Sequence, residues 1–138
     1  MQALVFSLTG VDPSCTPVAD IDSVPNACGI QVFFGTSCAD SASIGAHMYS
    51  ASLAEDPWAT VRYFAQADGT SVGVTAGVRT GYAINDLYGR VAVVHDATGA
   101  PVACAVIEEA ASVAISASRF GSSPWWTLAG TAALLHMI

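Results

Sequence analysis

Two pairs of β-rich runs, each pair joined by a short glycine turn, constrain the fold of this chain more than any other feature. The turns are Asp68-Gly69 and Thr98-Gly99, and the flanking runs are residues 61–66, 70–78, 91–94 and 102–107. Such turns between β-branched and aromatic residues are typical of β-hairpins. Residues 3–9 and 30–36 are also strand-like, and no long stretch before residue 108 has a helical period. The sequence therefore predicts an all-β fold.

Length and charge limit the classes of function. The chain has 138 residues, of which 53% are apolar, enough for one domain with a single core. Its basic residues are Arg62, Arg79, Arg90 and Arg119, and the net charge is −7. This balance argues against binding to nucleic acid or to anionic membrane surfaces. It also disfavours the attraction of a small anionic substrate.

Four cysteines are either free thiols, two disulfides or a metal cluster. They are Cys15, Cys28, Cys38 and Cys104, and no Cys-x-x-Cys pair is present. Because these spacings do not fit a zinc ribbon, we expect two disulfides and an oxidising compartment, either extracellular or in the secretory pathway.

Several motifs follow one another in a characteristic order. Cys28-Gly-Ile-Gln-Val-Phe-Phe-Gly-Thr-Ser-Cys38 is followed by Gly45-Ala-His47, then by Gly89-Arg-Val-Ala-Val-Val-His95 and Gly99-Ala-Pro-Val-Ala-Cys104. With this order and spacing, the chain resembles copper/zinc superoxide dismutases over residues 2–107. The Asp56-Pro-Trp58 segment is similar to one in the short, zinc-less branch of that family.

The resemblance implies a fold, a pairing of cysteines and a domain boundary. The expected fold is an immunoglobulin-like Greek-key β-sandwich or flattened barrel. The family bonds the positions of Cys38 and Cys104, which leaves Cys15 to pair with Cys28. We expect residues 1–107 to form the dismutase-like β-domain and residues 108–138 to form a small-residue linker and an apolar tail.

The same resemblance places the four copper-ligand positions on Gln31, Phe33, His47 and His95. The family has histidine at all four, because alternate strand residues share a face and imidazole suits copper. In this chain only His47 and His95 keep an imidazole, as vestigial ligands. Gln31 offers an amide oxygen that suits copper poorly, and Phe33 offers no donor. We expect Phe33, together with Phe34, to fill the space of the metal.

Two further elements of the family site are missing. The arginine that guides superoxide is replaced by Pro101. Residues 48–61 contain no histidine, so a zinc site is not expected. Asp96 would either fix the tautomer of His95 or simply form a turn. Trp58, Trp125 and Trp126 would either pack or mark a contact with carbohydrate or protein.

Two functions from different classes follow from these residues. The first is a metal-free, non-catalytic domain with a structural or binding role, without a cofactor, whose partners would be neighbouring dismutase-like domains or another protein. The alternative is a superoxide dismutase with a reduced copper site on His47 and His95, which would convert superoxide to oxygen and hydrogen peroxide. Losses at Gln31, Phe33 and Pro101 favour the first function.

The C-terminal segment differs in composition from the rest. Residues 124–138 carry no charged side chain apart from His136, but they are fewer than the roughly 20 residues of a membrane-spanning helix. They are similar to a lipid-anchor signal, which would attach the chain to a membrane; a further buried strand or an altered gene end are the alternatives. Met1 precedes the first strand without a visible signal sequence, as expected for a truncated gene or one unit of a longer protein.

Overall fold

The computed structural model describes residues 1–17, 21–108, 115–116 and 132–137. Its regular elements are mainly strands: β1 (Gln2–Thr9), β2 (Ile30–Phe33), β3 (Ser71–Val78), β4 (Val91–His95), β5 (Pro101–Val106), β6 (Ile115–Ser116) and β7 (Ala132–Met137). Within the described residues, helix is limited to α1 (Ser41–Ile44) and the single 3-10 turn η1 (Ile84–Leu87). The prediction of an all-β fold is confirmed.

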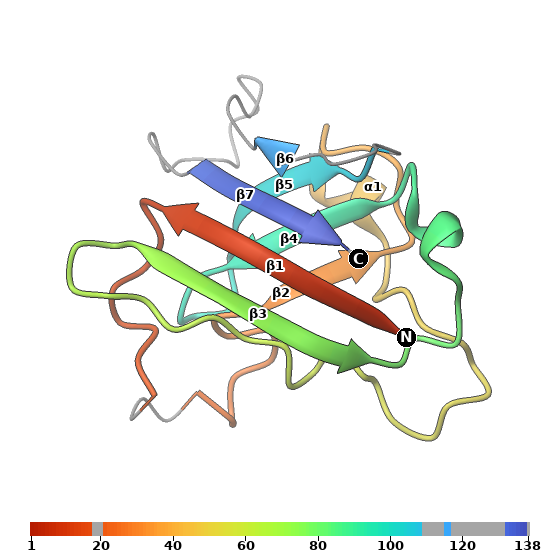
Figure 1. Ribbon diagram of the computed structural model, residues 1–138, viewed down its shortest axis with the longest axis horizontal. Coiled ribbons are helices and arrows are strands. Elements are labelled where there is room, and N and C mark those ends of the chain that lie inside the picture. Colours follow the sequence, from red (N-terminus) through yellow and green to blue (C-terminus); the bar gives the residue numbers. More distant parts are fainter. Residues whose placement is uncertain (18–20, 109–114, 117–131, 138) are drawn as a thin grey trace.

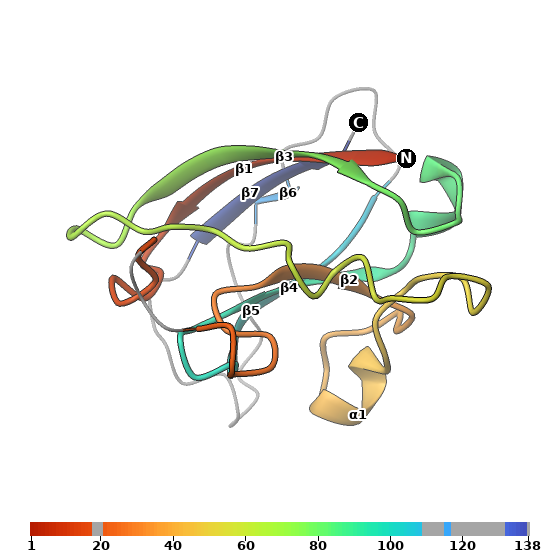
Figure 2. The ribbon, with the colours of Figure 1, turned by 90° about the horizontal axis from the view of Figure 1, so that it is seen from below.

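The strands form two antiparallel sheets that lie face to face. One sheet has the order β3-β1-β7-β6 and the other has the order β2-β4-β5. Figure 1 shows the first sheet in front of the second, and Figure 2 shows the two layers from the side. This arrangement is a β-sandwich, with α1 on the outer side of the three-stranded sheet (Figure 2).

The main core fills the space between the sheets. Alternation along β1 buries Leu4, Phe6 and Leu8, while the residues between them are partly exposed. They pack in one cluster with Ile30 and Val32 from the opposite sheet. Burying each such side chain contributes about 1.5–3 kcal/mol to the free energy of folding.

The three-stranded sheet is unusual in being buried on both faces. Every residue of β2 and of β4 is buried. A second cluster covers the outer face, and it consists of Phe33, Ile44, Val91, Val93 and Cys104 with the partly buried Cys38. Ile44 and Cys38, from the segment that follows β2, therefore cover this outer face.

Two disulfides attach loops to the sandwich. Cys15 is bonded to Cys28, and Cys38 is bonded to Cys104 of β5. These are the pairings that the resemblance implied. Both bonds are compatible with an extracellular or secreted protein.

The first predicted hairpin is only partly present. The turn closes where the Gln66 amide donates to the Thr70 carbonyl at 2.8 Å, and β3 follows it. Residues 61–66 are not a strand, because they pair with the other sheet instead. Gly29 and Arg62 form an isolated bridge, and the Tyr63 amide donates to the Cys28 carbonyl at 2.9 Å. Tertiary pairing therefore overrides the local β propensity of this run.

The C-terminal segment contributes strands to the domain. Residues 132–137, expected to form an apolar tail beyond a boundary at residue 107, form β7 between β1 and β6. Of the alternatives for this segment, a further strand is what the structure contains at these residues. Among the described residues, no helix is long and apolar enough to cross a membrane.

The two disulfides should contribute unequally to stability. Cys38 and Cys104 are 66 residues apart, whereas Cys15 and Cys28 are 13 apart. Replacing Cys38 and Cys104 with serine should lower the free energy of unfolding by about 4 kcal/mol, and replacing Cys15 and Cys28 should lower it by about 3 kcal/mol. Denaturant unfolding monitored by tryptophan fluorescence measures both. A larger loss for the shorter loop would contradict the chain-entropy explanation.

Candidate functional site

The candidate site lies on the outer face of the three-stranded sheet. Gln31 and Phe33 are two apart on β2, so both side chains lie on this face, opposite Val93 and Val91 of β4. His95 follows Val93 by two residues on the same strand. Strands β2 and β4 therefore place Gln31, Phe33 and His95 on one surface, as the resemblance implied.

His47 reaches this surface because the chain returns along β2. The Phe34 amide donates to the Ala46 carbonyl at 2.9 Å, the Met48 amide donates to the Val32 carbonyl at 2.8 Å, and Phe33 and His47 form an isolated bridge. Gly35 permits this return, because a Cβ at that position would lie 2.0 Å from the Ser43 carbonyl oxygen. Only glycine fits there.

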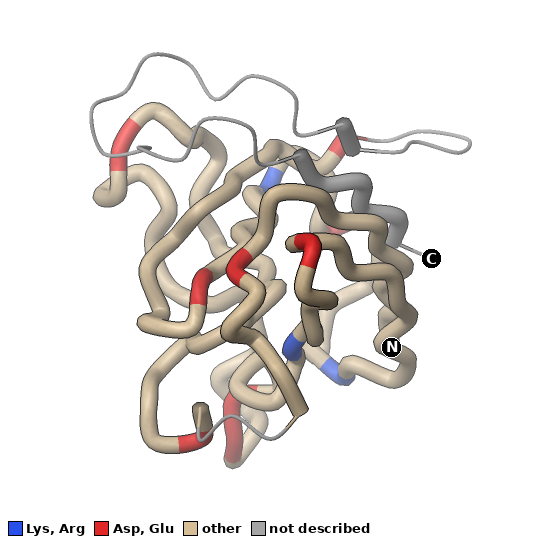
Figure 3. Tube along the Cα trace, turned by 90° about the vertical axis from the view of Figure 1, so that its left-hand side faces the viewer, with Lys and Arg blue, Asp and Glu red and all other residues tan. Residues whose placement is uncertain are grey.

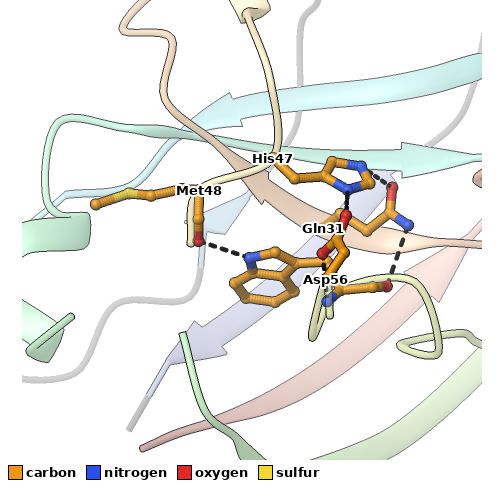
Figure 4. A network of polar contacts seen from close by, with 5 residues as sticks. Gln31, His47, Met48 and Asp56 are labelled. Atoms are coloured by element: carbon orange, nitrogen blue, oxygen red, sulfur yellow. Dashed lines mark hydrogen bonds and ion pairs between the residues drawn. The ribbon is translucent and has the colours of Figure 1, made fainter. Parts of the chain in front are cut away.

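Asp56 holds the His47 imidazole from one side. Its Oδ2 atom lies 2.5 Å from His47 Nδ1, and its Oδ1 atom accepts the Trp58 amide at 2.8 Å. Trp58 is fully buried, and its indole Nε1 donates to the Met48 carbonyl at 2.8 Å. The Asp56-Pro57-Trp58 turn is therefore fixed to the segment that carries His47 (Figure 4).

Gln31 holds the same imidazole from the other side. Its Nε2 atom donates to the Trp58 carbonyl at 3.2 Å, which turns its Oε1 atom toward His47 Nε2 at 3.1 Å (Figure 4). A carbonyl only accepts, so this contact fixes the orientation of the amide. Both atoms that face His47 are thus acceptors, so each ring nitrogen already lies against an oxygen atom of the chain.

Phe33 lies against both imidazoles. Its ring centroid is 4.6 Å from that of His47 in an edge-on arrangement, and 5.9 Å from that of His95. These distances are typical of direct aromatic packing. Phe34 does not share this role, because its side chain is exposed and its ring packs against Tyr82. The expectation that both phenylalanines fill the site was therefore wrong for Phe34.

His95 is buried in a neutral environment. Its side chain is 4% exposed, and among the described residues its Nδ1 atom has no hydrogen-bond partner. The pKa of His95 is lowered to about 4 overall. Burial is the largest cause and the charge of His47 adds to it, while a backbone hydrogen bond to Gly29 and the charge of Asp96 act in the opposite direction. The imidazole is therefore uncharged at neutral pH.

Asp96 forms a turn and does not orient His95. Its Oδ1 atom accepts the Thr98 amide at 2.8 Å, the Thr98 hydroxyl at 2.7 Å and the Ala100 amide at 3.0 Å. Of the two alternatives for this residue, the turn is the one that the structure contains.

The described side chains around His47 and His95 do not fit a copper or a zinc site. Among the described residues, no group of three or more His, Cys, Asp or Glu side chains is arranged to hold a metal ion. Pro101 pairs with His95 across the β4–β5 ladder, at the position implied for a guiding arginine. Arg90 donates to the Phe34 carbonyl at 2.8 Å, and Arg62 is 3.0 Å from Asp22. In the described part of the chain, these two arginines are engaged by other groups, and Arg79 follows β3 in the other sheet.

A surface pocket of about 340 Å³ lies apart from these residues. It is lined by Gly10, Val11, Asp12, Pro13 and Asp96. Asp12 accepts backbone amides of Ser14 and Ala97, which holds its pKa below the usual value despite partial burial. The two carboxylates therefore stabilise loops. Nothing among the lining residues provides a nucleophile with a general base beside it, as catalysis would need.

Sequence reasoning missed the pairing of Asp56 with His47. In the sequence, Asp56 stands out only as part of the Asp56-Pro-Trp58 motif, and no local pattern links it to a histidine nine residues away. Trp58 packs, in agreement with one of its two alternatives. Trp125, Trp126 and Arg119 lie outside the described residues, and His136 is described only as a backbone partner of Val5.

The Asp56–His47 contact should be measurable as a coupling energy. Asp56→Asn keeps an oxygen for the Trp58 amide but removes the carboxylate from His47, and should lower the free energy of unfolding by about 2 kcal/mol. The same change in a His47→Gln background should cost less than about 0.5 kcal/mol. Glu55→Gln is the matched control, since Glu55 is exposed. Equal losses in both backgrounds would show that the two residues act independently.

His95 should make stability depend on pH. Its pKa is about 4 in the folded chain and near 6.5 when unfolded, so the unfolded chain binds more protons between these values. The contribution is complete above pH 6.5 and is lost as pH falls toward 4, by about 3 kcal/mol in total. Denaturant unfolding across this range, compared with His95→Leu, isolates it. The buried control Val93→Ala should retain the pH dependence, and an unchanged dependence in His95→Leu would contradict the assignment.

No protein-family model matches the chain, and neither a curated protein nor a solved structure matches it. Its function is therefore inferred from its own residues.

Proposed function

We propose that this chain is a copper/zinc superoxide dismutase-like domain with a Greek-key sandwich fold that holds no metal, and that it has a structural or binding role outside the cell. The motifs that carry the resemblance come together in space, which supports the proposal. Phe33 bridges His47, contacts His95, and lies in one cluster with Cys104 and Cys38. A chance match of separate motifs would not require these positions to meet.

The proposal rests on one observation: other side chains of the chain already contact His47 and His95 where a metal would bind. His47 uses Nδ1 for Asp56 and Nε2 for Gln31, and the Phe33 ring packs against both histidines. To bind copper through these histidines, the chain would have to break the Asp56 or the Gln31 contact and displace a packed ring. The site thus consists of hydrogen-bonded and apolar side chains that pack against one another.

The distribution of charge supports a non-catalytic role. Acidic residues lie in several separate loops of the described chain (Figure 3), and the net charge is −7. Superoxide is an anion, so such a surface would slow its approach unless local arginines opposed it. Pro101 removes the charge at the implied guiding position.

The proposed location and partners follow from the chemistry of the chain. Two disulfides suit an extracellular or secretory compartment. The surface charge disfavours nucleic acid, and leaves neighbouring dismutase-like domains or another protein as partners. Membrane attachment through an anchor signal over residues 124–138 would require β7 to leave its sheet.

One observation favours the alternative of a reduced copper site. The buried His95 Nδ1 atom lacks a hydrogen-bond partner among the described residues, which is costly for a polar atom unless something else binds there. A dismutase that used His47 and His95 with water would use this atom. His47 would then have to release one of its two oxygen partners.

Copper loading distinguishes the two functions. After incubation with excess copper and removal of the free metal, the unmutated chain should hold well under one copper per chain and should not dismutate superoxide. The Gln31→His and Phe33→His double variant should bind copper stoichiometrically, because it restores four imidazoles, whereas each single variant should not. Adding Pro101→Arg to the double variant should raise any dismutase rate at low ionic strength.

Metal content by atomic spectroscopy and a dismutase assay are the two measurements. Tight stoichiometric copper in the unmutated chain, together with substantial turnover, would reject the metal-free proposal in favour of the reduced copper site.

A further inference from the structure

Strand β3 is an edge strand with an exposed apolar face. Among the described residues, it pairs only with β1. Val72 is 79% exposed and Val74 is 64% exposed, and Val74 lies opposite the partly exposed Val5 of β1. Figure 1 shows β3 along the outside of its sheet. The backbone N–H and C=O groups on the side of β3 that faces away from β1 are thus available for pairing.

The strand lacks the charged residues and proline that commonly protect such an edge. Ser71–Val78 has the sequence SVGVTAGV, with no charged residue and no proline. Edge strands that must stay unpaired commonly carry lysine or proline, or they are short. Eight uncharged residues with two exposed valines are instead typical of a strand that pairs with another strand.

We propose that β3 pairs with β3 of a second copy of this chain, as an antiparallel and two-fold symmetric edge. The regular part of the strand is residues 71–75, because the register with β1 shifts between Thr75 and Val78. A two-fold axis through the middle of this part lies at Gly73. Val72 of each copy then lies opposite Val74 of the other copy. Cross-strand valine pairs are favourable in antiparallel sheets.

Charges at the two ends of β3 identify the occupant as another copy. Asp68 precedes the strand, and the exposed Arg79 follows it. In the described structure, Arg79 has no acidic group within 4.0 Å, whereas the Asp68 Oδ1 atom binds Thr70 and leaves Oδ2 free. Antiparallel pairing around Gly73 brings Asp68 of each copy to within about one residue of Arg79 of the other.

The negative charge on the rest of the surface makes β3 the favourable place for contact. Each copy has a net charge of −7, so two copies repel one another least where the surface is uncharged and the flanking charges are opposite. The pairing rests on β3 alone. It does not depend on whether His47 and His95 hold a metal, and its test is independent of copper.

Sedimentation velocity of the unmutated 138-residue chain over a range of concentrations is the first test. The mass should rise with concentration from 14.1 kDa toward twice that value. Val74→Lys should remove the association at all concentrations used, because it places a charge in the valine pair. Val106→Lys is the matched control, since Val106 is an exposed valine on an edge strand of the other sheet, and it should leave the association unchanged.

The flanking charges give a second and milder test. Arg79→Gln should weaken the association roughly fivefold, through two exposed ion pairs. Asp68→Asn should weaken it to the same extent, while its side-chain oxygen still accepts the Thr70 amide. Arg79→Asp should weaken it further, because like charges then face each other.

Cysteine crosslinking tests the register. A mixture of Val72→Cys and Val74→Cys chains should give a disulfide-linked dimer on a non-reducing gel, and each variant alone should give much less. A chain that stays monomeric at every concentration, as expected if β3 takes a strand from a different protein, would overturn the proposal. So would a dimer that persists in Val74→Lys or is lost in Val106→Lys.

Discussion

The burial of the three-stranded sheet on both faces is the constraint on which the rest of the structure depends. Its inner face packs against β1 across the main core, and its outer face is covered by the chain around Cys38 and Ile44, which leads on to His47. That cover is held by the Cys38–Cys104 disulfide at one end and by the Asp56–His47 contact at the other. A buried polar residue such as Gln31 is therefore tolerated only because both ends of its amide have partners.

The same constraint accounts for the residues that stand at the metal positions implied by the resemblance. Glutamine at position 31 keeps a polar group next to His47 and satisfies one of its nitrogens, while phenylalanine at position 33 fills the space between the imidazoles with apolar atoms. The same ring packs against His95, whose burial lowers its pKa. On our proposal, this face changed from binding a metal to supporting the fold.

The alternation of β2 was sufficient to predict that Gln31 and Phe33 share a face, and the turns were sufficient to predict antiparallel strands; the placement of His95 beside them was implied only by the resemblance. Other features depend on contacts between distant parts of the chain, which no local pattern contains. Residues 61–66 have strand propensity but pair with Gly29, residues 132–137 join β1, and Phe34 turns toward Tyr82. The Asp56–His47 contact needs the folded loop before it can be recognised.

The most direct test of the central claim is the response of the two imidazoles to copper. In a chain labelled with ¹⁵N at histidine, the ring nitrogens of His47 and His95 can be followed by NMR while copper is added. Our account predicts that both sets of resonances stay unchanged at one equivalent of copper, because Asp56, Gln31 and Phe33 occupy the positions around them. Joint broadening or shifting of His47 and His95 at that stoichiometry would contradict it and would indicate a shared metal site.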